Sequence, residues 1–329
     1  MKTAVLGLGW WGRHIVTTLK DSTKLDVTTI AARSREKHQS FADEANVTLV
    51  SGYDDILKDP AIEAVILCTP HSQHEEQALA AIAAGKQLFC EKPLALSKAS
   101  VEKIVAAADA RNIVIGIGHE RRFEASMEAI AKEVSTGALG THMHVEANFS
   151  HSLLASADAD NWRGSQEEAP AAGMTGMGIH LTDLYLWMFG PVEKVCAHTA
   201  KRVLDLPTGD LVAVELVFES GATGFVTGIS ATPYYGRFSV FGDKKWIEAR
   251  DTAHPQHGGE VHLVSCDSSG EQKTQTLGPR DPVQANLEEW ADAVAGRGSY
   301  RFTSEHLVHN IAILEAIGKS ASAGEWAKV

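Results

Sequence analysis

The chain has 329 residues, 44% of them hydrophobic, and its 42 acidic residues outnumber its 30 basic ones for a formal net charge of −12 at pH 7. This length is typical of about two globular domains with sizeable cores. The acidic balance argues against a nucleic-acid partner, and no apolar run is long enough to cross a membrane. The four cysteines match no zinc or CxxC spacing, and the N-terminus carries no recognisable secretory leader, so we expect reduced thiols and a cytoplasmic location.

A glycine-rich turn begins almost at the first residue. The apolar run at residues 3–6 is typical of a buried strand, and Gly7-x-Gly9-x-x-Gly12 and a helical pattern follow it. In this context the dinucleotide fingerprint works through a tight turn, a close approach of the backbone to a pyrophosphate and close helix packing. A plain glycine-rich turn is the alternative. The cofactor-binding residues predicted here are Gly7, Gly9, Trp10, Trp11 and Gly12.

The residues after the second strand indicate which dinucleotide is bound. The second strand is predicted at 26–32 and a helix at about 35–45. An Asp or Glu at this point usually holds the ribose 2′-OH of NAD, but here no carboxylate precedes Glu36. The residues at this point are cationic or can donate hydrogen bonds, so they could bind a 2′-phosphate group. This favours NADP and leaves NAD as the alternative. These residues are Arg33, Ser34 and Arg35. Both arginines could instead be solvated at a helix start, with Arg33 stacked on adenine.

Strands and helices alternate through the rest of the first 122 residues. Apolar strand-like runs at 64–68, 87–90 and 113–117 are separated by helical patterns at about 74–84 and 97–111. Repeated β-α-β units predict a doubly wound parallel sheet of the Rossmann type, whose carboxyl strand ends face the cofactor crevice. The residues at these ends that we predict to contact the cofactor are Thr69, Pro70, His71, His74, Glu91, Lys92 and Arg121.

The combination of motifs resembles the Gfo/Idh/MocA family, the glucose–fructose oxidoreductase and inositol dehydrogenase group. The resemblance covers nearly the whole chain, and Glu-Lys-Pro is its most specific piece. It implies an NAD(P)-dependent oxidoreductase that acts on sugars, polyols or related hydroxy compounds. The pieces that carry it are Gly7-x-Gly9-x-x-Gly12, Thr69-Pro70-His71 with His74, Glu91-Lys92-Pro93, Gly118-His119-x-Arg121-Arg122-Phe123, Trp162-Arg163 and Gly173…His180-x-x-Asp183.

Lys92 is the predicted proton relay. Hydride transfer from an alcohol carbon to nicotinamide C4 requires removal of the hydroxyl proton, and a lysine made less basic by burial or by a positive nicotinamide can accept it. Pro93 would fix the backbone beyond the lysine, and Glu91 could bind the nicotinamide ribose. The alternative is an ordinary Lys-Pro turn at the surface.

His180 is the second predicted catalytic residue, on a helix expected from residue 173 to 189. It lies one turn from Asp183, so both side chains can face one pocket. His180 could donate a hydrogen bond to the substrate oxygen or share a proton with Lys92, and a core histidine is the alternative. The resemblance places the Trp-Arg pair beside the nicotinamide and substrate. The predicted substrate-binding residues are Lys92, Arg122, Trp162, Arg163, His180 and Asp183.

One position departs from the family pattern. Many members have an Asp four residues before the histidine, and this chain has Gly176 there. Asp183 is a conceivable substitute. The departure leaves room for a different substrate orientation and for a second function, that of a non-catalytic dinucleotide-binding sensor. The resemblance offers a further alternative, because some relatives are glycosidase-like enzymes that use a bound dinucleotide for transient oxidation and elimination.

The second half of the chain is rich in strands that follow one another without helices. Residues 141–150 alternate, with His142 and His144 on one face, which suits a wet or subunit-facing sheet better than a metal site, and no metal is predicted. The expected architecture is a Rossmann domain at 1–122 and an α+β domain at 123–329 with a large, mostly antiparallel open sheet. The last helices are free to pack back on the first domain. The resemblance implies a homodimer or homotetramer paired through this sheet.

Overall fold

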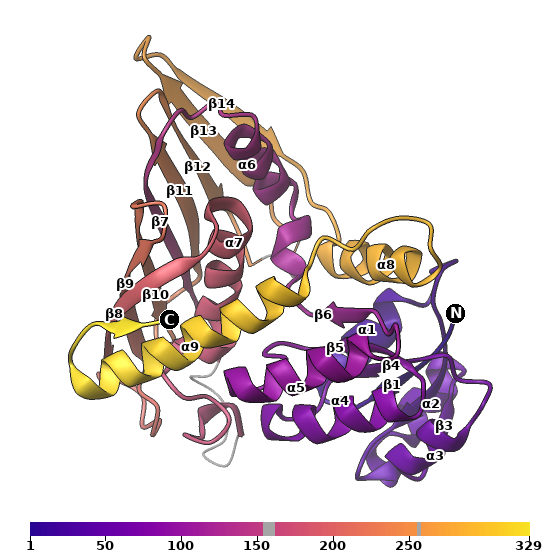
Figure 1. The fold of residues 1–329 in the computed structure, drawn as a ribbon. Helices are drawn as coiled ribbons and strands as arrows, with labels where there is room; N and C mark the ends of the chain where they lie inside the picture. The colour runs from indigo at the N-terminus through magenta and orange to yellow at the C-terminus, as the bar shows by residue number, and fades with distance from the viewer. Residues whose placement is uncertain (154–161, 255–257) are drawn as a thin grey trace. The chain divides into compact units, whose positions relative to one another are not determined.

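The computed structural model describes residues 1–153, 162–254 and 258–329 (Figure 1). Contacts between residues divide the chain into two units. The first comprises residues 1–120 and 282–308, and the second comprises residues 121–281 and 309–329. The chain therefore leaves the first unit after residue 120 and re-enters it near the C-terminus.

The first unit is built on six strands in the order β3-β2-β1-β4-β5-β6. The pairings between them are parallel, which confirms the predicted doubly wound sheet. The strand order reverses between β1 and β4, and ligands of such sheets bind at the carboxyl ends beside that point. The strands are β1 (Lys2–Leu6), β2 (Asp26–Ala31), β3 (Thr48–Val50), β4 (Ala64–Leu67), β5 (Gln87–Cys90) and β6 (Ile115–Ile117). The helices are α1 (Trp10–Thr18), α2 (Gln39–Ala45), α3 (Tyr53–Lys58), α4 (His74–Ala83) and α5 (Lys98–Asp109).

The helix α8 (Pro282–Val294) belongs to this first unit. Its Trp290 is completely buried, packs edge-on against Phe89 of β5 with ring centroids 5.4 Å apart, and donates to the carbonyl oxygen of Val114 at 2.9 Å. Asn286 of the same helix donates to the carbonyl oxygen of Ile117 at 2.8 Å. The chain thus returns to the first unit because a large aromatic ring and two buried donors complete its core there.

The second unit is built on a nine-stranded sheet in the order β14-β13-β12-β11-β7-β10-β9-β8-β15. Within the described ranges its pairings are antiparallel except that of β7 with β10, which confirms a large, mostly antiparallel sheet. The strands are β7 (His142–Ser150), β8 (Val192–Ala200), β9 (Leu211–Phe218), β10 (Thr223–Ile229), β11 (Tyr235–Gly242), β12 (Lys245–Asp251), β13 (Val261–Asp267), β14 (Gln272–Leu277) and β15 (Ala327–Lys328).

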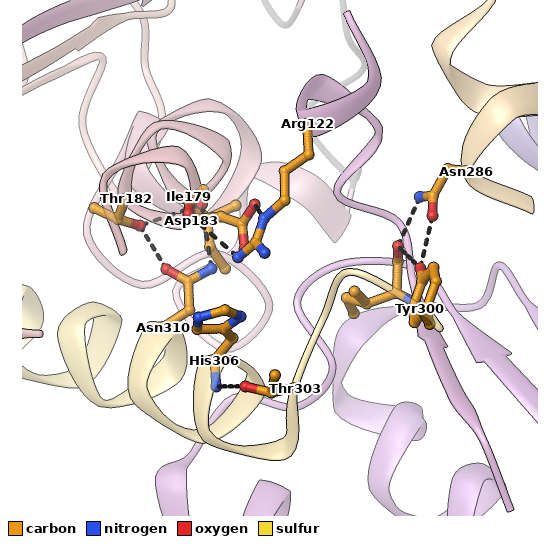
Figure 2. Close-up of polar contacts among 10 residues, drawn as sticks. Arg122, Ile179, Thr182, Asp183, Asn286, Tyr300, Thr303, His306 and Asn310 are labelled. Carbon is orange, nitrogen blue, oxygen red and sulfur yellow. Dashed lines mark hydrogen bonds and ion pairs between the residues drawn. The ribbon is translucent and has the colours of Figure 1, made fainter. Parts of the chain in front are cut away.

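Two helices of the second unit, α6 (Ala125–Ser135) and α7 (Ile179–Phe189), precede most of these strands. Helix α7 is buried along almost its whole length and packs on β7, and its Tyr185 donates to the carbonyl oxygen of Phe225 at 2.7 Å. The long C-terminal helix α9 (Ser304–Ala323) begins after Thr303, whose Oγ1 accepts the His306 N–H at 3.2 Å (Figure 2). In the part of the chain that is described, each helix is too short or too polar for a membrane crossing.

Two predicted helices differ from the observed ones. The helix expected over 35–45 is a 3₁₀ turn at Arg35–Lys37 followed by α2, because the backbone of His38 has a φ of −121° that no helix accepts. The helix expected over 173–189 opens with a π-helical turn at Met174–Gly178 before α7. Such turns are rare, and hydrophobic periodicity alone does not reveal them.

Candidate active site

The glycine turn joins β1 to α1. Gly7 has a φ of +96°, in the left-handed region, and a Cβ there would lie 2.6 Å from the carbonyl oxygen of Cys68. A Cβ at Gly12 would collide with the carbonyl oxygen of Gly7, so α1 can approach the turn only with glycine at this position. A Cβ at Gly9, the N-cap of α1, would meet no atom within 4 Å. The turn presents bare backbone and open space where this motif binds a pyrophosphate, so its residues fit a dinucleotide.

Two alanine substitutions separate the structural role of this turn from its binding role. We expect Gly12→Ala to lower the melting temperature and to abolish dinucleotide binding, because the colliding atoms belong to the backbone. Gly9→Ala has room for its methyl group, so it should melt like the wild type yet bind NADPH at least about tenfold more weakly. Quenching of Trp10, which is 53% exposed beside this turn, measures binding. Unchanged affinity in Gly9→Ala would argue against a pyrophosphate here.

The residues predicted to select the cofactor lie in the loop after β2. Arg33 and Ser34 are exposed in this loop. The guanidinium of Arg35 donates to the carbonyl oxygen of Leu49 at 3.1 Å and to Oγ of Ser51 at 3.3 Å, both at the end of β3. Arg35 therefore braces the loop, while Arg33 presents an exposed cation beside it.

Arg13, which sequence reasoning missed, connects α1 to the same loop. Its guanidinium donates to the carbonyl oxygen of Lys37 at 3.2 Å and contacts Nδ1 of His38 at 3.0 Å, and it lies 5.0 Å from the centre of the Phe41 ring. A guanidinium can only donate, so this nitrogen of His38 accepts. Burial lowers the pKa of His38, and the charges of Arg13 and Lys37 lower it further. The sequence signal that could have identified Arg13 is its position directly after Gly12, the last glycine of the fingerprint.

The ends of β4 and β5 bring several predicted cofactor residues together. His74 is completely buried, with Nδ1 2.8 Å from the carbonyl oxygen of Pro93 and Nε2 3.0 Å from that of Thr69. The ring of His71 lies edge-on to His74 with centroids 5.8 Å apart. The peptide bond between Lys92 and Pro93 is cis. His74 therefore connects the Thr-Pro-His segment to the Glu-Lys-Pro turn at this edge of the sheet.

Glu91 lies against the end of the neighbouring strand β6. It is 8% exposed, and a Cβ on Gly118 would lie 2.6 Å from the carboxyl carbon of Glu91. Glycine at position 118 leaves the space that this carboxyl group fills. Pro70, in an extended conformation, leads into the 3₁₀ turn at His71–Gln73 on the other side.

His180 stands at the start of α7 in the second unit. It is 4% exposed, follows the π-helical turn directly, and lies edge-on to Phe149 with ring centroids 6.5 Å apart. Gly176, within that turn, is exposed, and a Cβ there would meet no atom within 4 Å. The position at which the family pattern has an Asp is thus open surface in this chain.

The Trp162-Arg163 pair forms a 3₁₀ turn with Gly164. The Arg163 guanidinium lies 4.2 Å from the centre of the Trp162 indole, and a Cβ on Gly164 would lie 2.8 Å from a methyl carbon of Leu206. The loop that carries Leu206 is held by Asp210, whose carboxylate accepts three backbone N–H groups at 2.6–2.9 Å. Burial alone would raise the pKa of Asp210, and these donors outweigh it and hold the pKa below its ordinary value. The Trp-Arg turn therefore packs on an anchored loop.

Arg122 and Asp183 form a buried ion pair (Figure 2). The Arg122 guanidinium donates to the two carboxylate oxygens at 2.8 and 2.7 Å, and the side chains are 0% and 3% exposed. One residue earlier, Thr182 donates to the amide oxygen of Asn310 at 2.7 Å, and that amide donates to the carbonyl oxygen of Ile179 at 3.3 Å. Polar contacts from two other segments therefore fix the first turns of α7, which carry His180.

Arg121 is engaged in a second buried cluster. Its guanidinium donates to Glu124 at 2.9 and 3.1 Å and to Asp251 at 3.2 Å, and lies 4.6 Å from the centre of the Phe149 ring. Tyr234 donates to the same Asp251 carboxylate at 2.6 Å. Sequence reasoning missed Glu124 and Asp251, which are the partners that this arginine needs when buried. Cofactor contact by Arg121, and substrate contact by Arg122 and Asp183, stay predictions.

His142 and His144 of β7 each contact other protein side chains. His142 packs edge-on against Phe189 with centroids 5.4 Å apart, and burial lowers its pKa. Nδ1 of His144 lies 2.7 Å from Oγ1 of Thr223, and Nε2 lies 3.7 Å from Glu146. Among the described residues, no group of three or more His, Cys, Asp and Glu side chains is arranged to hold a metal ion.

Two family models match the chain. Residues 1–119 match the oxidoreductase family with an NAD-binding Rossmann fold, and residues 127–248 match the GFO/IDH/MocA C-terminal domain. The 1,5-anhydro-D-fructose reductase of Ensifer adhaerens is 26% identical over 312 residues, which cover 92% of this chain and 91% of the reductase.

Solved structures share the fold over nearly the whole chain. A putative NADPH-dependent oxidoreductase from Desulfitobacterium hafniense superposes with a TM-score of 0.90 at 21% identity, over 99% of this chain and 97% of that one. A levoglucosan dehydrogenase in complex with NADH superposes with a TM-score of 0.87 at 20% identity, over 100% of this chain and 99% of that one.

Proposed function

Because this chain belongs to the Gfo/Idh/MocA family of NAD-binding oxidoreductases, we propose that it is a dehydrogenase or reductase acting on a CH–OH group of a sugar, polyol or related hydroxy compound. We propose NADP as the preferred cofactor and NAD as the weaker alternative. A bound nicotinamide supplies the carbon, C4, that exchanges a hydride with the substrate carbon. The names of the anhydrofructose reductase and the levoglucosan dehydrogenase support the substrate class.

The place of Lys92 on the parallel sheet carries this proposal. Lys92 follows the end of β5 by two residues, β5 pairs with β4, and β4 pairs with β1, which ends in the glycine turn. The carboxyl ends of parallel neighbours lie at one edge of a sheet, so Lys92 shares an edge with the dinucleotide turn. We assign to the Lys92 amine the removal of the hydroxyl proton in oxidation and its return in reduction.

The other predicted residues support this step. We propose that His180 donates a hydrogen bond to the substrate oxygen or shares the proton with Lys92, and that Trp162 and Arg163 contact the substrate. Besides the substrate contact predicted for Arg122 and Asp183, we assign to this pair the positioning of α7, because each side chain satisfies the charge of the other. Arg121, predicted to contact the cofactor, is assigned a positioning role as well because it pairs with Glu124 and Asp251.

The cofactor preference is tested by two arginine variants of the same loop. We expect Arg33→Ala to weaken NADPH binding by about 10- to 100-fold and to leave NADH binding nearly unchanged, because a charge-assisted phosphate contact would be lost. Arg35→Ala is the matched control, since that side chain braces β3, and it should change both affinities to a similar, smaller extent. Titration of each variant with both reduced cofactors measures the effect. Equal losses for the two cofactors in Arg33→Ala would contradict NADP selection by this residue.

The reaction is tested by a screen of aldoses, ketoses, polyols, anhydrosugars and glycosides with NAD and NADP side by side. Absorbance of the reduced nicotinamide should change in proportion to product for at least one substrate, and faster with NADP. Glycoside cleavage without net change in cofactor would instead support the elimination chemistry. Dinucleotide binding without turnover of any compound would support a sensor.

We also propose that the chain forms a homodimer or homotetramer through the face of the nine-stranded sheet that carries Phe225. This side chain is 45% exposed in the middle of a sheet, beside the ion pair of Arg237 and Glu146. The pairing itself follows the resemblance to the Gfo/Idh/MocA family, and Phe225 marks the face of the sheet proposed for it. The mass in solution, measured by light scattering, distinguishes the oligomer from a monomer.

A further inference from the structure

His74 is a buried imidazole between two carbonyl oxygens. It is 0% exposed, and its ring nitrogens lie 2.8 Å from the carbonyl oxygen of Pro93 and 3.0 Å from that of Thr69. A backbone carbonyl oxygen can only accept a hydrogen bond, so each ring nitrogen must carry a proton to make its bond. A neutral imidazole carries one such proton in either tautomer. In a neutral ring, the lone pair of one nitrogen would therefore face a carbonyl oxygen. This contact is repulsive, and solvent has no access to the site to relieve it.

We propose that His74 is a doubly protonated positioning residue, which ties the turn after Lys92 to the end of β4 by one N–H bond to each. The inference that both ring nitrogens donate hydrogen bonds rests on geometry alone. The expected effect of His74 on turnover rests in addition on the role proposed for Lys92.

The surroundings of His74 bear on the stability of this charge. Two charge-assisted hydrogen bonds favour the imidazolium, whereas burial and the N-terminus of α4 oppose it. Helix α4 packs on α5 and β5. Besides His74, the titratable and charged groups on these elements are Glu75, Glu76, Cys90, Lys98, Glu102, Lys103 and Asp109, and those in the adjoining turns are His71, Lys86, Glu91, Lys92 and Arg111.

Two of these groups have settled charge states. The Glu75 carboxylate pairs with Lys103 at 3.0 Å and accepts from Ser100, which lowers its pKa, and burial keeps the pKa of Cys90 well above its ordinary value. The cysteine is therefore neutral and cannot act as the counter-charge. The carbonyl oxygens of Pro93 and Thr69 lie within hydrogen-bond distance of the two ring nitrogens of His74.

A fixed cation at this turn has two consequences for Lys92. It holds the backbone on which the amine is mounted, and it favours the neutral, proton-accepting form of a second basic group nearby. We therefore expect His74→Gln to lower kcat by about 10- to 100-fold, since the single amide nitrogen of glutamine carries no charge and cannot take the places of both ring nitrogens. The acid limb of the kcat–pH profile should move to higher pH in this variant, whereas a purely structural defect would leave the limb in place. His262→Gln, at an exposed position of β13 in the second unit, is the matched control and should keep the wild-type profile.

The charge itself is measured by nuclear magnetic resonance of the whole chain labelled with ¹⁵N-histidine. The two ring nitrogens of His74 should both resonate as protonated nitrogens from pH 6 to pH 8, with and without NADPH. The signal is assigned by its loss in His74→Gln, or by sequential assignment of the wild type if that variant does not fold. One protonated and one unprotonated nitrogen at pH 7 would overturn the proposal.

Lys92→Met, assayed in parallel, separates this inference from the proposed function. A protonated His74 together with full turnover in Lys92→Met would refute the role of Lys92 and leave the charge of His74 standing. A neutral His74 together with an inactive Lys92→Met would refute the inference alone.

Discussion

Replacing Lys92 with methionine is expected to lower kcat by about 10³-fold, because methionine keeps the apolar stem of the side chain but cannot carry a proton. The dissociation constant for NADPH should stay within about twofold of the wild-type value, since the glycine turn and Arg33 are unchanged. Steady-state kinetics with the best substrate of the screen and a fluorescence titration measure the two quantities. A large loss of kcat with preserved binding is the signature of a lost proton relay.

Lys103→Met is the control for this experiment. Lys103 lies on α5, its side chain is 65% exposed, and it pairs with Glu75 at the surface. The variant removes the same ammonium group from the same unit and should retain wild-type kcat. Retention of more than about a tenth of kcat in Lys92→Met would show that another group moves the proton.

Removing one member of the Arg122–Asp183 pair is expected to destabilise the protein by about 3–5 kcal/mol, because the remaining charge is left buried without its partner. The pair is 0% and 3% exposed and bidentate, so neither group can turn to water. Denaturant unfolding of Arg122→Met and of Asp183→Leu measures the loss. Both variants should also lose turnover, because the pair fixes the helix that carries His180.

The double variant Arg122→Met with Asp183→Leu distinguishes a buried charge from a lost contact. It removes both charges and should recover most of the free energy of unfolding, to within about 1 kcal/mol of wild type. Lys58→Met is the control for charge removal at the surface. Its pair with Asp54 is 77% and 79% exposed, and the variant should change stability by less than about 0.5 kcal/mol. Additive losses in the double variant would contradict a charge-pair origin.

Patterns that are local in the chain allowed the parallel sheet of the first unit to be predicted. Gly12 is required by a backbone contact within the strand–turn–helix unit, and Gly7 is required by its own positive φ of +96°. The short apolar run of β4 is buried at every position, as expected for a strand inside a parallel sheet. The position of Lys92 after β5 follows from the same regularity, because parallel strands bring their ends to one edge.

Partners that are distant in the chain could not be predicted in the same way. Arg122 and Asp183 are 61 residues apart, and Arg13 and His38 are 25 apart. Arginine, aspartate and histidine are residue types that commonly bind ligands, so the sequence does not reveal that these side chains contact one another. Only the packing of separate elements shows that Asp183 neutralises the charge of Arg122 and that Arg13 contacts the loop after β2.

The alternation of strands and helices in the first unit, its parallel sheet and the residue types at the carboxyl edge could be predicted from the amino-acid sequence, because they follow from hydrophobic periodicity and from glycine sterics within short segments. That α8 completes the first core, that a π-helical turn precedes His180 and that His74 faces two carbonyl oxygens became visible only in the folded chain. The physical reason is that burial and hydrogen-bond partners are properties of the packed chain, and the same residue takes different roles according to which distant segment lies against it.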